Sequence, residues 1–448
     1  MAMRKQVILI TLLCAIFCAC KQRKTENNSP EIPADSTNTS KQNPRLYNCS
    51  EDSTVKYLLF LPENISGEIP LLVFFDPSGN AALPVIRYKE LAQKMGIAIA
   101  GSMNSRNGQT IGQSVYFGKT LINDIINKNK IDKERIFAGG FSGGARVASR
   151  LAEMNPQIKA VIGNSAGFDI SSGYFPKFGF IGIGGSADMN MLELVNTHKY
   201  LNGSKTPHML LMFNGTHEWA PAQEMEKSIL WMLCLSKHPD AKSQLDKIES
   251  EIKAIADSLE NKNNLLQAAT EWETLLGCSK FLDLNNKNAE DNYYRIKKLP
   301  GFNNLIDEMS GIWNKETAEQ NRLMQGFQKW NITEWEAETA SLKKTSEQKT
   351  QTGSMHKRLL GFLSLYFYSN TNRTLATSDS SASGRSSAIY TIVDPENPEA
   401  WFLRAIHLAR YQHNNAAKLA LALAQTKGFN DQTRVAAQPE LMQLMNNP

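Results

Sequence analysis

Cysteines are few in this sequence, and their spacing argues against two common kinds of site. There are six, and no two of them form a C-x-x-C pair, so neither a zinc site nor a disulfide framework is indicated. Three lie in the first twenty residues, which leaves Cys49, Cys234 and Cys278 for the folded part. The sequence leaves undecided whether Cys234 and Cys278 form a disulfide in an oxidising compartment.

Clusters of one charge are also missing. The formal net charge is +5 over 448 residues, and the lysines and arginines are spread along the chain. A nucleic-acid-binding surface needs a dense basic patch or stripe. We therefore expect no nucleic-acid partner.

Long apolar runs are scarce, and the one at the start has the form of an export signal. Basic residues precede an apolar run over residues 7–19, which is too short for a comfortable membrane span. Cys20 then resembles the lipid-attachment cysteine of bacterial lipoproteins, although Phe17 and Cys18 stand where an aliphatic and a small residue are usual. We expect a signal peptide over residues 1–20 and lipidation at Cys20, with ordinary secretion as the alternative.

The next segment, residues 21–45, contains almost no apolar side chain. It cannot bury a core, so it predicts a disordered tether. A lipid anchor followed by a tether places the folded part at a membrane of the bacterial cell envelope. The lack of acidic residues in residues 21–24 favours the periplasmic side.

The rest of the chain divides into two predicted domains, the first over residues 46–238. There, apolar strands alternate with helices, which predicts an α/β fold: a mostly parallel, doubly wound sheet with helices on both faces. The expected strands cover residues 55–61, 70–75, 97–100, 135–141, 160–163, 178–183 and 208–213, and the expected helices cover residues 88–95, 113–127, 191–201 and 222–235. In such sheets the ligand lies beyond the carboxyl ends of the strands.

The centre of this pattern is residues 133–151, which read as a strand, a sharp turn and a helix. Gly140, Ser142 and Gly144 fit the G-x-S-x-G nucleophile elbow, in which the serine hydroxyl is exposed above the end of a parallel sheet. Side chains at the two glycines would clash where the strand and the helix meet. The pattern predicts Ser142 as a nucleophile.

Two later strand ends present the partners that a serine nucleophile needs. Asp188 follows one strand, and His217 follows the last. Serine stays protonated near neutral pH, so it needs a base, His217, and the base needs an acid, Asp188, to fix its tautomer. The chain order Ser142, Asp188, His217 is the one expected of this fold. Asp169, after the preceding strand, is the alternative acid.

The reaction also needs hydrogen-bond donors for the oxyanion of the tetrahedral intermediate. One is expected to be the backbone N–H of Gly143, the residue after the nucleophile. The second is expected in the loop after the strand over residues 70–75, where Pro77 has no N–H to donate. This leaves the N–H of Ser78 or of Gly79.

Residues 57–231 resemble the α/β-hydrolase family, and more narrowly its secreted feruloyl esterases, acetyl xylan esterases and polyhydroxybutyrate depolymerases. The resemblance rests on Y-L-L-F-L-P from Tyr57, K-E-R-I-F-A-G-G-F-S-G-G-A from Lys133 and N-G-T-H-E-W-A-P from Asn214. It implies hydrolysis of carboxylic esters through an acyl-serine, without metal or cofactor. At residues 76–77, Asp-Pro departs from the His-Gly that many relatives carry.

The second predicted domain, residues 241–448, has helical apolar spacing and few strand-like runs, which predicts an all-helical region. Small residues recur between large ones over residues 401–424 in a way that resembles a tetratricopeptide repeat. A less clear copy over residues 356–394 would be interrupted by a serine-rich loop over residues 378–387. Such helices either bind a partner protein or pack on the hydrolase and orient it.

The sequence thus predicts an exported, lipid-anchored serine hydrolase. Only a short segment separates the strands that end at residue 163 and begin at residue 178, so no lid is expected, and an open site suits acylated carbohydrate or other polymer-attached esters. A serine peptidase would use the same triad. A non-catalytic envelope scaffold that binds a partner through its helical repeats is the alternative from another class, and the Asp-Pro departure keeps it open.

Overall fold

The computed structural model describes residues 43–170, 173–377 and 379–446. The predicted signal peptide, Cys20 and most of the predicted tether lie outside these described residues. Contacts within the chain form two compact units, of which the first ends at Gly311 and the second begins at Ile312. The two units differ in architecture.

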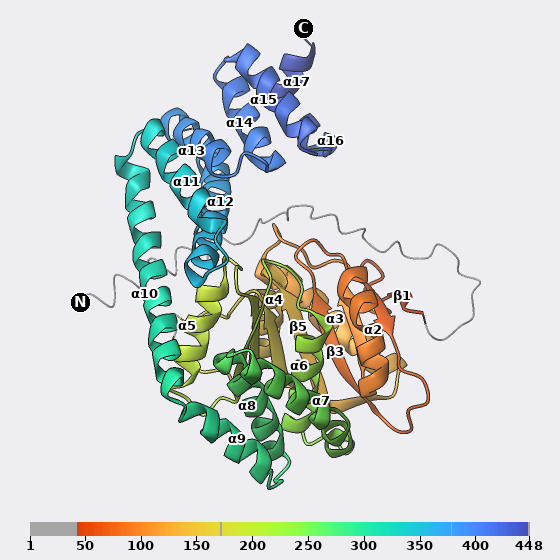
Figure 1. Cartoon of the computed structure of the whole chain (residues 1–448). Helices are drawn as coiled ribbons and strands as arrows, with labels where there is room; N and C mark the ends of the chain where they lie inside the picture. The colour runs from red at the N-terminus through yellow and green to blue at the C-terminus, as the bar shows by residue number, and fades with distance from the viewer. Residues whose placement is uncertain (1–42, 171–172, 378, 447–448) are drawn as a thin grey trace. The chain divides into compact units, whose positions relative to one another are not determined.

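The first unit is built on an eight-stranded sheet with the order β1-β2-β4-β3-β5-β6-β7-β8 (Figure 1). The strands are β1 (Arg45–Asn48), β2 (Lys56–Phe60), β3 (Ile69–Phe75), β4 (Ala98–Ser102), β5 (Ile131–Phe141), β6 (Ile158–Asn164), β7 (Gly179–Gly185) and β8 (His208–Phe213). Strands β3 to β8 are mutually parallel, whereas β2 pairs antiparallel with β4, and β1 antiparallel with β2. The mostly parallel sheet is confirmed, and the edge strand β1 was not predicted.

Both faces of this sheet are buried, because successive side chains of a strand point to opposite sides. In β3, Leu72 and Phe74 belong to one core, and Leu71 and Val73 belong to the other. Helices α2 and α6 cover the first face, and α3 and α4 cover the second, which confirms the doubly wound arrangement. The helices that follow the strands are α2 (Ala82–Met95), α3 (Ile111–Lys128), α4 (Gly143–Met154), α5 (Met191–Leu201) and α6 (Ala222–Leu235).

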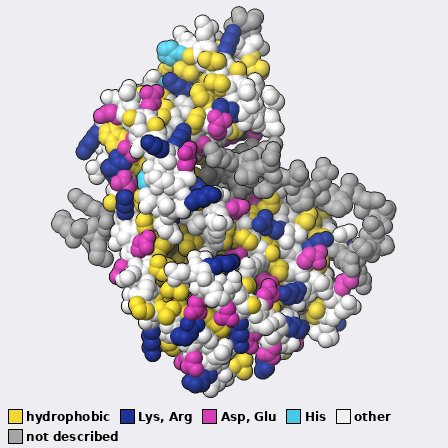
Figure 2. Space-filling view, viewed as in Figure 1, with side chains coloured by type: hydrophobic (Ala, Val, Ile, Leu, Met, Phe, Trp, Pro, Cys, Tyr) yellow, Lys and Arg dark blue, Asp and Glu magenta, His cyan; other side chains and the backbone are white. Residues whose placement is uncertain are grey.

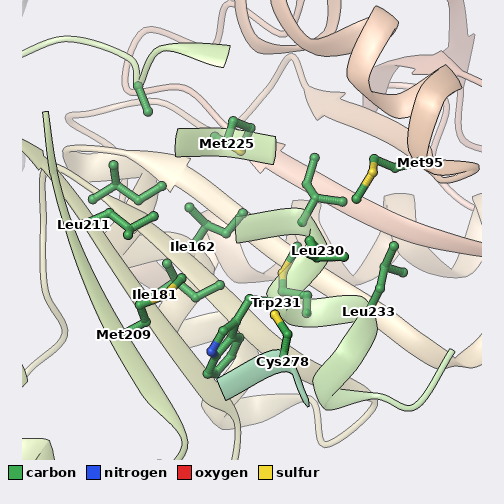
Figure 3. Packing of buried hydrophobic residues seen from close by; sticks show 14 of the residues in the cluster. Met95, Ile162, Ile181, Met209, Leu211, Met225, Leu230, Trp231, Leu233 and Cys278 are labelled. Atoms are coloured by element: carbon green, nitrogen blue, oxygen red, sulfur yellow. The ribbon is translucent and has the colours of Figure 1, made fainter. Parts of the chain in front are cut away.

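The helical layer on the first face continues beyond the last strand. It takes in α7 (Ala241–Asn261), α8 (Leu265–Phe281) and α9 (Lys287–Lys297). Leu245 of α7 and Trp272 of α8 lie in the same core as Trp231 of α6, and Figure 3 shows Trp231 beside Cys278 of α8. The all-helical region begins at Ala241, close to the predicted position, but its first helices belong to the compact unit of the sheet.

Two thiols meet in this core. Cys234 of α6 and Cys278 of α8 are both buried and free. A hydrogen bond with Cys234, together with burial, raises the pKa of the Cys278 thiol well above its ordinary value. The pair that the sequence leaves open is therefore in contact, and its oxidation to a disulfide stays a prediction.

A buried ion pair joins α6 to α8. Lys227 Nζ lies 2.5 Å from Glu271 Oε1, and each side chain is 6% exposed. Burial raises the pKa of Glu271, against the lowering effect of Lys227. Lys227 Nζ also lies 3.9 Å from Glu224 Oε1, but Glu271 is its close partner, so removing either member of the close pair leaves a buried charge poorly compensated.

We expect Lys227→Met to lower the free energy of unfolding by about 3–5 kcal/mol, because it leaves the Glu271 carboxylate buried without its partner. The double variant Lys227→Met/Glu271→Leu should recover most of that loss, since it removes both charges. Urea denaturation of the three proteins measures the difference. A single variant as stable as the wild type would show that the pair does not hold the two helices together.

The second unit consists of helices in its described part. α10 (Pro300–Lys329) runs from the first unit into the second, and it is followed by α11 (Ile332–Ser346), α12 (Gln351–Ala376), α13 (Ser380–Val393), α14 (Pro398–Arg410), α15 (Asn414–Thr426), α16 (Gln432–Ala436) and α17 (Pro439–Asn446). α12 packs with α13 and α14 with α15. The helical character is confirmed, while the tetratricopeptide repeat stays a prediction. No helix in the described ranges is long and apolar enough to cross a membrane.

The predicted serine-rich loop over residues 378–387 is wrong, because most of it is helix α13. The Asp379 side chain caps the start of this helix. Ser386 is fully buried, and its hydroxyl hydrogen-bonds with Asn370 and Thr371 of α12. Serine disfavours a helix interior when it competes for the backbone, and these cross-helix partners remove that competition.

His407 of α14 makes the second unit sensitive to pH. Its side chain is buried, and its Nδ1 lies 3.0 Å from the hydroxyl of Ser383. Burial, and then the nearby Arg404, His413 and Arg410, lower the pKa of His407 to about 4. The folded protein therefore keeps this ring neutral at pH values where an unfolded histidine binds a proton.

We expect the second unit to lose stability as the pH falls from about 6.5 to about 4, because only the unfolded state then takes up the proton. His407→Gln should flatten this part of the dependence, whereas His356→Gln, at a histidine of α12 that is not among the groups acting on His407, should leave it in place. Thermal unfolding across this pH range gives the comparison. Equal slopes for wild type and His407→Gln would contradict the assignment.

Candidate active site

The candidate nucleophile lies on the turn from β5 into α4. Ser142 has a φ of 52°, a conformation that side chains rarely adopt. A Cβ atom at Gly144 would lie 2.0 Å from the carbonyl oxygen of Phe75, and one at Gly140 would lie 2.4 Å from the backbone of Gly144. Strand and helix therefore approach each other only because both positions are glycine, as the elbow motif predicts.

Three strand ends bring Ser142, His217 and Asp188 together. His217 Nε2 lies 3.0 Å from Ser142 Oγ, and His217 Nδ1 lies 2.8 Å from Asp188 Oδ1. Asp188 follows β7 and His217 follows β8, so the parallel strands place them at the same edge of the sheet. The alternative acid, Asp169, is exposed, and the imidazole bonds with Asp188 instead.

Burial differs between these side chains in a way that suits their chemistry. Asp188 is fully buried, whereas the side chain of His217 is 18% exposed. Asp188 Oδ1 also accepts a hydrogen bond of 2.8 Å from the N–H of Asn190, which fixes the carboxylate. The acid is held rigidly out of water, and the base stays within reach of a substrate.

The start of α4 supplies one expected oxyanion donor. Ser142 is the N-cap of this helix, and Gly143 is its first residue. The first N–H groups of a helix have no partner within the helix and carry its positive end. The N–H of Gly143 is therefore suited to an anion formed next to Ser142.

The loop after β3 differs from the expectation. The N–H of Ser78 donates to Asp76 Oδ1 at 2.8 Å, and the N–H of Gly79 donates to the carbonyl oxygen of Asp76 at 3.0 Å. Both N–H groups expected as the second oxyanion donor are thus used inside their own turn. The signal was present in the sequence, because an aspartate before Pro-Ser-Gly is typical of a turn closed by its own side chain.

Asp76 also connects this loop to the loop between β8 and α6, residues 214–221, which carries His217 and is called the histidine loop below. The sequence did not reveal this role. Its Oδ2 accepts a hydrogen bond of 3.1 Å from the indole N–H of Trp219, two residues after His217. The Trp219 ring lies 5.6 Å from the ring of Phe141, which in turn lies 4.6 Å from the imidazole of His217. The Asp-Pro departure therefore provides a buried carboxylate that holds the base in place.

Asn164, at the end of β6, is a second residue that sequence reasoning missed. Its carbonyl oxygen accepts the N–H of Ser142 at 2.8 Å. Its side chain accepts the N–H of Ala220 at 2.7 Å and donates to the carbonyl oxygen of Glu218 at 3.2 Å. One fully buried residue thus holds the nucleophile turn and both sides of Trp219 in the histidine loop. Asparagine followed by serine at a strand end gives no recognisable motif for such a role.

Over residues 43–170, 173–377 and 379–446, no three His, Cys, Asp or Glu side chains come together in a way that could hold a metal ion.

No family model matches the sequence, and no curated protein matches it. Several solved structures are similar over less than half of the chain. FphF, a fluorophosphonate-binding serine hydrolase of Staphylococcus aureus, matches 42% of this chain and 98% of its own, at 12% identity and a TM-score of 0.35. The S-formylglutathione hydrolase FrmB from Staphylococcus aureus matches 43% and 98%, at 13% identity and a TM-score of 0.36. Est1E from Butyrivibrio proteoclasticus matches 42% and 95%, at 12% identity and a TM-score of 0.34.

We expect Asn164→Asp to lower both stability and turnover. The new carboxylate would lose the donor to Glu218 and place a buried charge against that carbonyl oxygen and that of Ile183, which Asn164 also contacts. The loss of stability should be about 2–3 kcal/mol. Urea denaturation and hydrolysis of p-nitrophenyl acetate measure the two effects.

Asn127→Asp, the same change at an exposed position of α3, is the matched control and should alter neither value. Behaviour of Asn164→Asp indistinguishable from this control would refute the role given to Asn164.

Proposed function

We propose that the protein is a serine hydrolase that cleaves carboxylic esters through an acyl-serine intermediate. The observation that carries this proposal is the continuous hydrogen-bonded chain from Asp188 through His217 to Ser142. This is the arrangement that activates a serine hydroxyl near neutral pH.

Each residue has a definite step in this reaction. Ser142 Oγ attacks the ester carbonyl carbon while His217 Nε2 takes the hydroxyl proton. The N–H of Gly143 donates to the carbonyl oxygen as it becomes negative. The imidazolium, held by Asp188, then gives the proton to the departing alcohol, and water attacks the acyl-serine with the same base.

The length of the connection between β6 and β7 supports bulky esters as substrates. β6 ends at Asn164 and β7 begins at Gly179, which leaves too little chain for an inserted lid domain. Without a lid domain inserted at this point, an acyl group attached to a carbohydrate or another polymer could approach the serine. Acylated carbohydrate or polymer is thus the substrate class we propose.

A serine peptidase is the second candidate, because the same three side chains would cleave an amide.

The localisation and the partners remain proposals that rest on the sequence. They are export, the anchor at Cys20, a periplasmic position and a protein partner for the second unit. The face shown in Figure 2 has lysines and arginines interspersed with acidic residues in its described part, which supports the proposal that nucleic acid is not a partner. The non-catalytic scaffold stays the alternative from another class, because the N–H groups of Ser78 and Gly79 donate within their own turn.

The test is labelling of protein lacking residues 1–20 with a fluorophosphonate probe, followed by mapping of the modified residue. We expect the label on Ser142 and turnover of p-nitrophenyl acetate. Ser142→Ala should lose the label and at least about 10³-fold in kcat, because the nucleophile and base act as a unit. Comparison of an ester with the matching p-nitroanilide separates esterase from peptidase activity.

The matched control is Ser341→Ala, at an exposed serine of α11, which should label and turn over like the wild type. Heat-denatured wild type should not label. A folded wild type without label or turnover would refute the hydrolase and favour the scaffold.

A further inference from the structure

The active site described above contains one oxyanion donor, the N–H of Gly143, where the reaction calls for more. The loop after β3 does not offer the one donor expected from it, since Pro77 has no N–H and the N–H groups of both candidates, Ser78 and Gly79, donate to Asp76. The additional donor has to come from another side of the serine.

The loop after β4 reaches this place. The N–H of Asn107 donates to the carbonyl oxygen of Pro77 at 2.8 Å, which ties the two loops together. Contact at Gly79 is equally close, since a Cβ atom there would lie 3.0 Å from the carbonyl oxygen of Met103 and 3.5 Å from that of Ser105. Residues 103–107 therefore form a fixed wall beside the loop that follows β3.

The side chain of Asn107 extends from this wall to the first residue of α4. A Cβ atom on Gly143 would lie 2.0 Å from Asn107 Oδ1, 3.0 Å from Cγ and 3.3 Å from Nδ2. The carboxamide thus occupies the space that any side chain at position 143 would need.

This contact explains a glycine that the backbone does not require. Gly143 is helical and is absent from the positive-φ glycines of the described chain, so other residues would suit its conformation. Glycine is needed here to admit the amide of Asn107, just as Gly144 is needed to admit the backbone of Phe75. Gly143 and Gly144 thus leave space for two different neighbours, the side chain of Asn107 and the backbone of Phe75.

We propose that the carboxamide of Asn107 is the second oxyanion donor. Its Oδ1 is the atom that faces Gly143 in the structure, so the role requires the amide to turn about the Cβ–Cγ bond, which places Nδ2 beside the N–H of Gly143. The inference deepens the proposed function and rests on it. An amide suits this role because it is neutral at all relevant pH values and donates through two N–H groups. Side-chain amides are among the donors that proteins use for tetrahedral oxyanions.

The experiment compares Asn107→Ala and Asn107→Asp with the wild type in hydrolysis of p-nitrophenyl acetate and in inhibition by an aryl trifluoromethyl ketone, which forms an oxyanion on the serine. We expect Asn107→Ala to lower kcat about 10²–10³-fold with little change in KM, because the hydrogen bond forms with the developing charge. The inhibition constant of the ketone should rise by a similar factor. Asn107→Asp keeps the shape but replaces the donor with a negative charge, so it should lose at least as much.

Arg106→Ala, at the exposed neighbour in the same loop, is the matched control and should retain the wild-type constants. An active wild type whose kcat and ketone affinity survive both Asn107 substitutions overturns this inference and leaves the hydrolase intact. Loss of kcat in Asn107→Ala with unchanged ketone affinity also overturns it, because the loss of an oxyanion donor would weaken binding of the ketone as well. An unlabelled, inactive wild type overturns the inference and the proposed function together.

Discussion

The hydrogen bond between the N–H of Ser142 and the carbonyl oxygen of Asn164 is the contact on which the rest of the site depends. It ties a strained turn to the end of the neighbouring strand, and the side chain of the same asparagine holds the histidine loop. Strain of this kind persists only where the surroundings determine the backbone from several sides. Here two glycines, a buried amide and the parallel sheet do so together.

The residues that perform chemistry were more predictable than those that hold them. Ser142, Asp188 and His217 follow strand ends in a known order, and strand ends of a parallel sheet meet at one edge. The side chains of Asn164 and Asp76 hold Ala220 and Trp219, which lie more than fifty positions away, and no local pattern encodes such contacts. The N–H groups of the loop after β3 are different, because they donate to Asp76 within the same turn. The residues Asp-Pro-Ser-Gly are typical of such a turn, so this direction has a local cause.

Fold prediction succeeded where periodicity was strong and failed where tertiary partners decided. Buried parallel strands produce continuous apolar runs, and these gave the sheet. The serine-rich part of α13 looked like a loop because the hydroxyl of Ser386 finds its partners on α12 and that of Ser383 on His407 of α14, which the sequence of α13 alone does not show. Likewise, the apolar stripes of α7 and α8 predicted helices without revealing that α6, which covers one face of the sheet, is the helix they pack against.

That covering layer has a consequence for synthesis of the chain. The last strand ends at Phe213, yet the core on one face of the sheet still lacks residues as far along as Phe302. A chain made from its N-terminus thus completes every strand well before it can bury that face. Exposed apolar surface on an incomplete sheet is prone to aggregation. The interval between Phe213 and Phe302 is therefore when the nascent chain most needs a chaperone.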